Sequence, residues 1–163
     1  MALHWRYNKK DFGKHCDSQM GWRACPIYNF GHTHTIQFAK LVHDVMKAQK
    51  IRKIYIAAPP DQHALIQSIS DELTQNHKII VKTGVDLDRE IMQSTYKSCG
   101  YIQDKYDDVL SVIEQEICFK SAYFLRSDQS TWSSNIREER DANNIFETMP
   151  LSDLLKNYIS AIN

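Results

Sequence analysis

The segment Lys53-Ile54-Tyr55-Ile56-Ala57 (KIYIA) decides the fold class, because every residue after Lys53 is apolar and none alternates with a polar one. Such an uninterrupted run predicts a strand buried on both faces, as in parallel sheets covered by helices. Pro59-Pro60-Asp61 ends the strand, and the spacing of apolar residues predicts a helix over Asp61–Gln75. Lys78–Lys82 (KIIVK) predicts the next strand. Together these segments form a strand–helix–strand unit, which is typical of α/β folds.

The same alternation of strands and helices extends in both directions from this unit. Upstream, Ala2–Tyr7 predicts the first strand and Thr35–Lys50 predicts an amphipathic helix. Downstream, the pattern predicts one more strand, Ala122–Leu125. It also predicts four helices, over Asp86–Tyr96, Asp107–Lys120, Ser130–Asn143 and Ser152–Ile162. This order predicts a Rossmann-like parallel sheet flanked by helices, built by a single domain over residues 1–163.

Composition and charge exclude several classes of protein. With 42% hydrophobic and 25% charged residues, the 163-residue chain has the composition of a globular domain rather than a disordered one. Its formal net charge is zero and it has no dense basic stripe, so we expect no nucleic-acid partner. The longest clean apolar run, Ile54–Ala58, is far too short to span a membrane. Neither GxGxxG nor GxxxxGK occurs, so a glycine-rich phosphate loop is not expected.

The stretch from Asn8 to Thr33 is predicted as a long loop, because its polar and irregular pattern exceeds the usual length of a connection. It contains Cys16 and Cys25, and three histidines fall within the same twenty residues: His15, His32 and His34. A zinc site is disfavoured, because the cysteines lack the CxxC spacing. A Cys16–Cys25 disulfide is favoured in an oxidising compartment, and a pair of free thiols is the alternative.

Candidate ligand-binding residues lie where predicted strands end, since ligands of parallel α/β sheets bind beyond the carboxyl ends of the strands. His4 and Arg6 share one face of the first strand, and the planar, permanently charged guanidinium of Arg6 suits a diphosphate. The alternative for Arg6 is a surface ion pair with a carboxylate such as Asp11.

A second candidate is the segment Ser127–Ser134, which follows a predicted strand and begins a predicted helix. The N–H groups at a helix start attract anions, and the hydroxyls of Ser130 and Thr131 add donors without any glycine. The alternative is simple N-capping of the helix by Asp128 or Ser130.

Glu114 is a third candidate, because it lies at the edge of the apolar stripe of the predicted helix Asp107–Lys120. A carboxylate there could accept hydrogen bonds from a nucleobase or a ribose. The alternative is an edge glutamate that is solvated or paired with Lys120.

The order of these features resembles the carboxyl-terminal half of the GDP-fucose protein O-fucosyltransferases. His4-Trp5-Arg6 is followed by Asp11-Phe12, then by KIYIA, then by VIEQEICFKSAYFLRSDQSTWSSNIREER over residues 112–140. The family has a His-x-Arg strand end, an acidic residue followed by Gln in a helix, a Ser-Thr-aromatic-Ser turn and a helix ending in Glu-Glu-Arg. The likeness covers about residues 2–144 and is closest over 109–140.

The resemblance implies one Rossmann-like half of a GT-B glycosyltransferase. Such enzymes transfer fucose from GDP-fucose, with inversion, to a Ser or Thr hydroxyl of a folded protein module. Arg6 would be the catalytic residue, contacting the diphosphate and stabilising the leaving group. The residues expected to bind GDP-fucose are His4, Arg6, Glu114, Ser130, Thr131 and Trp132.

The resemblance also implies the roles of the other residues and the compartment. Ser130 and Thr131 would bind phosphate oxygens, Trp132 would border the pocket, Glu114 would meet the guanine or its ribose, and His4 would shape the pocket. No metal or other cofactor is expected, because Arg6 and helix N–H groups stabilise the departing GDP. The expected location is the lumen of the endoplasmic reticulum or Golgi, which fits a Cys16–Cys25 disulfide.

The sequence departs from the family pattern at several places. Glu114 stands where the family has Asp, Arg126 where a glycine is expected, and Trp132 where Phe is usual. The amino-terminal half, which would carry the acceptor groove and a catalytic acidic residue, is expected to be absent. These departures leave two alternatives: a non-catalytic sugar- or protein-binding domain derived from such an enzyme, or another α/β nucleotide-sugar transferase.

Overall fold

The sheet of the computed structural model has five parallel strands, and the structure describes residues 1–7, 9–17, 24–93 and 98–162. The order across the sheet is β3-β2-β1-β4-β5. The strands are β1 (Ala2–His4), β2 (Lys53–Ala57), β3 (Ile80–Thr83), β4 (Phe124–Arg126) and β5 (Thr148–Pro150). The prediction of a Rossmann-like α/β fold is confirmed.

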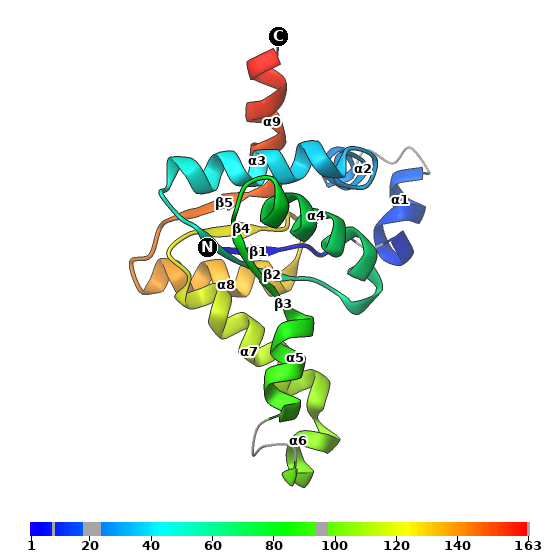
Figure 1. The fold of residues 1–163 in the computed structure, drawn as a ribbon, viewed down its shortest axis with the longest axis vertical. Helices are drawn as coiled ribbons and strands as arrows, with labels where there is room; N and C mark the ends of the chain where they lie inside the picture. Colours follow the sequence, from blue (N-terminus) through cyan, green and yellow to red (C-terminus); the bar gives the residue numbers. More distant parts are fainter. Residues whose placement is uncertain (8, 18–23, 94–97, 163) are drawn as a thin grey trace.

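Helices cover both faces of the sheet, as Figure 1 shows. One face packs against α2 (Cys25–Thr33), α3 (Thr35–Ala48), α4 (His63–Gln75) and α9 (Leu151–Ile162). The other packs against α7 (Tyr106–Lys120) and α8 (Thr131–Ala142). The remaining helical segments are a π-helical turn (Lys9–Gly13), α1 (Lys14–Asp17), a 3-10 turn (Pro60–Gln62), α5 (Gly84–Gln93) and α6 (Gly100–Asp104).

The two faces explain why β2 is apolar throughout. Ile54 and Ile56 pack into the core under α3 and α4, while Tyr55 and Ala57 pack into the second core under α7 and α8. Successive side chains of a strand point to opposite faces, so a strand covered on both sides needs apolar residues at every position.

The predicted loop over residues 8–33 is wrong where α2 forms. Pro26 is tolerated in the first turn of this helix, and Ile27 and Tyr28 are buried. Gly31 lies against the Trp5 ring so closely that a Cβ atom on Gly31 would overlap it. Burial against Trp5 therefore stabilises a helix whose proline, glycine and histidines predict a loop.

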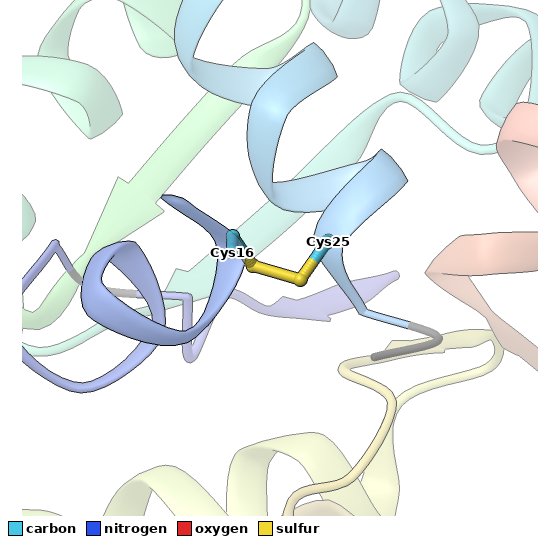
Figure 2. The surroundings of a disulfide bond; sticks show 2 residues. All are labelled: Cys16 and Cys25. Carbon is cyan, nitrogen blue, oxygen red and sulfur yellow. A yellow bond between two sulfur atoms is a disulfide. The ribbon is translucent and has the colours of Figure 1, made fainter. Parts of the chain in front are cut away.

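The Cys16–Cys25 disulfide, which the sequence analysis favoured for an oxidising compartment, is present in the structure. It joins α1 to the first residue of α2, with the two Cα atoms 5.3 Å apart (Figure 2). Cys99 and Cys118 are free thiols. The disulfide ties the segment after β1 to the helix that covers Trp5.

Arg140 holds the end of α7 against β5. Its side chain is fully buried and donates hydrogen bonds to five oxygens. The acceptors are the carbonyls of Cys118 (3.3 Å), Phe119 (2.7 Å), Ser121 (2.6 Å) and Glu147 (3.0 Å) and the Thr148 hydroxyl (3.3 Å). The guanidinium therefore supplies donors to carbonyls at the end of α7, where the Cys118 carbonyl also accepts from the Ser121 hydroxyl (2.8 Å). The sequence analysis predicted no strand at β5.

Among the residues that the structure describes, no helix is long and apolar enough to cross a membrane.

Candidate functional site

A cavity of about 880 Å³ opens at the carboxyl ends of β1, β2 and β3. Its lining includes Arg6 beyond β1, the segment 58–60 after β2, and Thr83 and Gly84 at the end of β3. Side chains of α4, α5 and α7 and Trp132 of α8 form the remaining walls. This is the edge of a parallel sheet where α/β proteins bind their ligands.

The cavity brings together four of the six residues expected to bind GDP-fucose: His4, Arg6, Glu114 and Trp132. Ser130 and Thr131 are not among its described lining residues. The Ser130 hydroxyl accepts a hydrogen bond from the Ser133 N–H (3.3 Å), which makes Ser130 the N-cap of α8. The structure therefore shows the N-capping alternative for Ser130, and Thr131 is exposed.

The turn after β4 is nevertheless bonded to the end of β1. The buried Ser127 hydroxyl accepts from the Arg6 N–H (2.9 Å) and donates to the His4 carbonyl (2.7 Å). Asp128 accepts hydrogen bonds from the Ser152 N–H (2.9 Å) and hydroxyl (2.8 Å), so it caps α9 instead of α8. The two Ser127 contacts fix the backbone that carries Arg6, and sequence reasoning missed them because they join residues more than 120 positions apart.

His4 is held between the sheet and α8. Its Nδ1 atom lies 2.7 Å from the Ser133 hydroxyl, and its ring centroid lies 4.0 Å from that of Trp132. Burial, together with the charge of Arg6, lowers the pKa of His4 to about 3. The ring is therefore neutral at physiological pH, which suits a hydrogen-bonding group rather than an acid.

Glu114 is held at the cavity wall by the sheet beneath it. Its Oε1 atom accepts a hydrogen bond from the Tyr55 hydroxyl (2.8 Å). Burial raises the pKa of Glu114, and the bond from Tyr55 acts in the opposite direction. A Cβ atom at Gly84 would lie 3.2 Å from Oε1, so the backbone passes close to the carboxylate. Lys120 pairs with Glu116 (2.7 Å) rather than with Glu114.

Two of the departures from the family pattern have clear positions. Trp132 bridges the cavity wall, because its indole N–H donates to the Ser111 hydroxyl on α7 (3.2 Å) while its ring contacts His4. Arg126 ends β4 and is not among the described residues of the cavity lining. Trp132 therefore shapes the cavity, whereas Arg126 does not crowd it.

Sequence reasoning missed the walls that α4 and α5 contribute. The α4 wall includes a polar row at helical spacing: Gln67, Ser70, Asp71 and Thr74. This row was a usable signal, because it forms a polar stripe beside the apolar side of the helix. On α5, Asp86 accepts from the Thr83 N–H (3.0 Å), and Asp88 accepts from the Tyr106 hydroxyl.

The cysteines and histidines near the amino terminus whose side chains the structure describes lie in separate contacts. Cys16 and Cys25 are bonded to each other, and the His32 ring lies 3.2 Å from the Tyr7 carbonyl oxygen. Within residues 1–7, 9–17, 24–93 and 98–162, no group of three or more His, Cys, Asp or Glu side chains is arranged to hold a metal ion.

The chain matches no protein-family model, and no curated protein matches it.

Proposed function

We propose that this chain is the donor-binding half of a glycosyltransferase that moves fucose from GDP-fucose to Ser or Thr hydroxyls of folded protein modules. The observation that carries the proposal is the cavity at the carboxyl edge of the sheet, which His4, Arg6, Glu114 and Trp132 line together. These residues come from the end of the first strand and from the stretch 112–140, which are more than 100 positions apart in the sequence. Each segment carries part of the motif order that resembles the GDP-fucose protein O-fucosyltransferases.

Arg6 stabilises the leaving group in the proposed reaction. The acceptor hydroxyl oxygen bonds to the sugar carbon, the bond from that carbon to GDP breaks, and the electron pair stays on the diphosphate. A guanidinium beside the diphosphate compensates this growing charge and stays protonated throughout. The hydroxyl proton passes to a base, which the resemblance assigns to the amino-terminal half.

The remaining cavity residues hold the nucleotide. The Glu114 carboxyl accepts hydrogen bonds from the base or the ribose, and Tyr55 keeps it in place. Trp132 borders the nucleotide, and His4 adds an uncharged polar group beside Arg6. No metal ion is required in this scheme, because Arg6 supplies the positive charge.

The Cys16–Cys25 disulfide supports a location in the lumen of the endoplasmic reticulum or Golgi, since disulfides persist in oxidising compartments. Acceptor modules carrying Ser or Thr would be met there.

A non-catalytic sugar- or protein-binding domain is the second candidate, and the charges on the cavity favour it. Among the described lining residues, Arg6 and Arg89 face a larger set of carboxylates: Asp71, Asp86, Asp88, Asp107 and Glu114. A diphosphate prefers a cationic site, and the Ser130 hydroxyl is already used as a helix cap.

Calorimetric titration with GDP tests the proposal. Arg6→Ala should weaken GDP binding about 10- to 100-fold, the usual effect of losing a hydrogen bond to a charged group. Arg52→Ala is the matched control, because Arg52 is exposed and directly precedes β2, at the opposite end of the strand from the cavity. Equal GDP affinity for wild type and Arg6→Ala would remove Arg6 from the site.

Two further measurements separate the alternatives. Stabilisation by UDP or ADP in place of GDP would indicate another nucleotide-sugar transferase, because a ligand raises the melting temperature according to its affinity for the native state. Glycan or protein binding without GDP-fucose turnover, measured on a protein that includes an amino-terminal half, would favour the non-catalytic domain.

A further inference from the structure

His4 and Ser133 form a buried pair behind the cavity wall. His4 is 5% exposed and Ser133 is fully buried. The His4 Nδ1 atom and the Ser133 Oγ atom are 2.7 Å apart, and Trp132 lies against the His4 ring. Ser133 is on the first turn of α8, whereas His4 ends β1, so the pair joins two elements that meet only in the folded protein.

The position of the hydroxyl hydrogen decides where the ring proton lies. A fully buried hydroxyl must donate to an acceptor. For Ser133, within the described part of the chain, that acceptor is His4 Nδ1. If Nδ1 carried the ring proton, the Nδ1–H hydrogen would occupy the contact between His4 and Ser133. The hydroxyl hydrogen of Ser133 would then be buried without an acceptor. The ring proton therefore lies on Nε2.

The Nε2 atom of His4 is not sealed from solvent. No described residue forms a hydrogen bond with it, and it is not among the polar atoms sealed from solvent without a partner. His4 lines the cavity beside Arg6. Because the pKa of His4 is lowered to about 3, the ring carries a single proton at neutral pH and offers a donor without a charge.

We propose that Ser133 is a positioning residue that holds His4 as a neutral Nε2–H donor facing the cavity, where this donor binds an anionic oxygen of the ligand beside Arg6. The identity of the ligand rests on the proposed function, whereas the arrangement of the proton rests on the His4–Ser133 contact. Ser133 itself is buried and does not reach the ligand.

The proton position is measured directly on the ligand-free protein. A long-range ¹H–¹⁵N spectrum of histidine-labelled wild type at neutral pH should show His4 protonated at Nε2 with a bare Nδ1. The His4→Gln variant identifies the His4 signals by their loss. Ser133→Ala should give His4 a mixture of the two neutral forms, and Ser133→Thr, which keeps the hydroxyl, should restore the Nε2–H form.

Ligand binding is measured separately by calorimetry with inorganic pyrophosphate and with GDP. Ser133→Ala should weaken both about tenfold, and Ser133→Thr should recover most of the loss. Ser134→Ala, one residue further along α8, is the matched control and should change neither the spectrum nor the affinity.

The outcomes separate the two proposals. Wild-type His4 protonated at Nδ1 would overturn the inference, even if Ser133→Ala does not fold. A folded Ser133→Ala with unchanged spectrum and affinity would overturn it too. If wild type shows the Nε2–H form but binds neither pyrophosphate nor GDP, the proposed function and the anion-binding role of His4 both fail, while the positioning of His4 by Ser133 stands.

Discussion

Replacing Arg140 with methionine (Arg140→Met) removes a buried guanidinium that donates to five oxygens around the end of α7 and the start of β5. Methionine fills much of the same space but donates no hydrogen bond. The acceptors remain: the carbonyls of Phe119 and Ser121 lose a donor that the helix end does not otherwise supply, whereas the Cys118 carbonyl keeps the Ser121 hydroxyl (2.8 Å). The exchange therefore differs from replacing both partners of a buried pair, which is often neutral.

The expected loss follows from this imbalance. Hydrogen bonds to a charged group are worth about 1.5–3 kcal/mol each, but their sum is offset by the cost of burying the guanidinium. Removing one partner of such a buried charged network typically costs about 3–5 kcal/mol. For a chain of this length, 1 kcal/mol corresponds to about 2–4 °C in melting temperature. We therefore expect Arg140→Met to melt on the order of 10 °C below wild type.

Urea unfolding and thermal melts followed by circular dichroism measure this difference. Arg52→Met is the control, because Arg52 is exposed and should change the free energy of unfolding by less than about 0.5 kcal/mol. If Arg140→Met unfolds within about 1 kcal/mol of wild type, the guanidinium does not hold α7 to β5 and the reasoning is refuted.

Three further predictions concern stability. Because the folded protein keeps His4 neutral, with a pKa of about 3 against an ordinary value of 6.5, the unfolded chain binds the extra proton first. Stability should therefore fall as the pH drops from 6.5 towards 3, by roughly 1.4 kcal/mol per unit from this group, and urea titrations of His4→Gln should lack that contribution. Gly31→Ala should lower the free energy of unfolding by about 1–3 kcal/mol, because its methyl group would overlap the Trp5 ring. Gly100→Ala is the control, because its methyl group would meet open space. Equal melting temperatures for the two variants would contradict the Gly31–Trp5 contact. Lys50 follows α3 with a φ of 55°, so Lys50→Gly should raise the free energy of unfolding by about 0.5–1 kcal/mol, and a loss of stability would count against the strain.

The regular elements that local pattern predicted are those whose burial is visible in their own residues. KIYIA is apolar because each face of β2 meets a different core, and its predicted bounds agree with the structure. The helix predicted over Asp107–Lys120 begins one residue earlier, at Tyr106. The strand carries an uninterrupted apolar run and the helix an apolar stripe at helical spacing, so neighbouring residues suffice to recognise both.

The elements that sequence analysis missed depend on distant contacts. The α2 helix contains proline, glycine and histidine, and it forms because its apolar side packs on Trp5 and its start is tied to Cys16. The strand β5 has only three residues, and it forms because β4 presents an open edge. No window of sequence around either element contains these partners.

The candidate site shows the same division. His4 and Arg6 were found from the strand predicted over Ala2–Tyr7, although β1 ends at His4 and Arg6 follows it. Glu114 was found from its place on an amphipathic helix. Ser130 and Thr131 are not among the described residues of the cavity lining: the Ser130 hydroxyl accepts from the Ser133 N–H of its own helix, and Thr131 is exposed. The His4–Ser133 contact joins residues 129 positions apart and was not predictable from either segment.

The order of strands and helices, and the apolar faces that bury them, are contained in the amino-acid sequence, since they depend on periodicity over a few residues. Which strand ends share a cavity was decided only by the tertiary structure. β1 lies between β2 and β4, and this placement brings Arg6, Glu114 and Trp132 to one edge of the sheet. The physical reason is that strand order and register minimise the free energy of the whole core, to which every segment contributes at once.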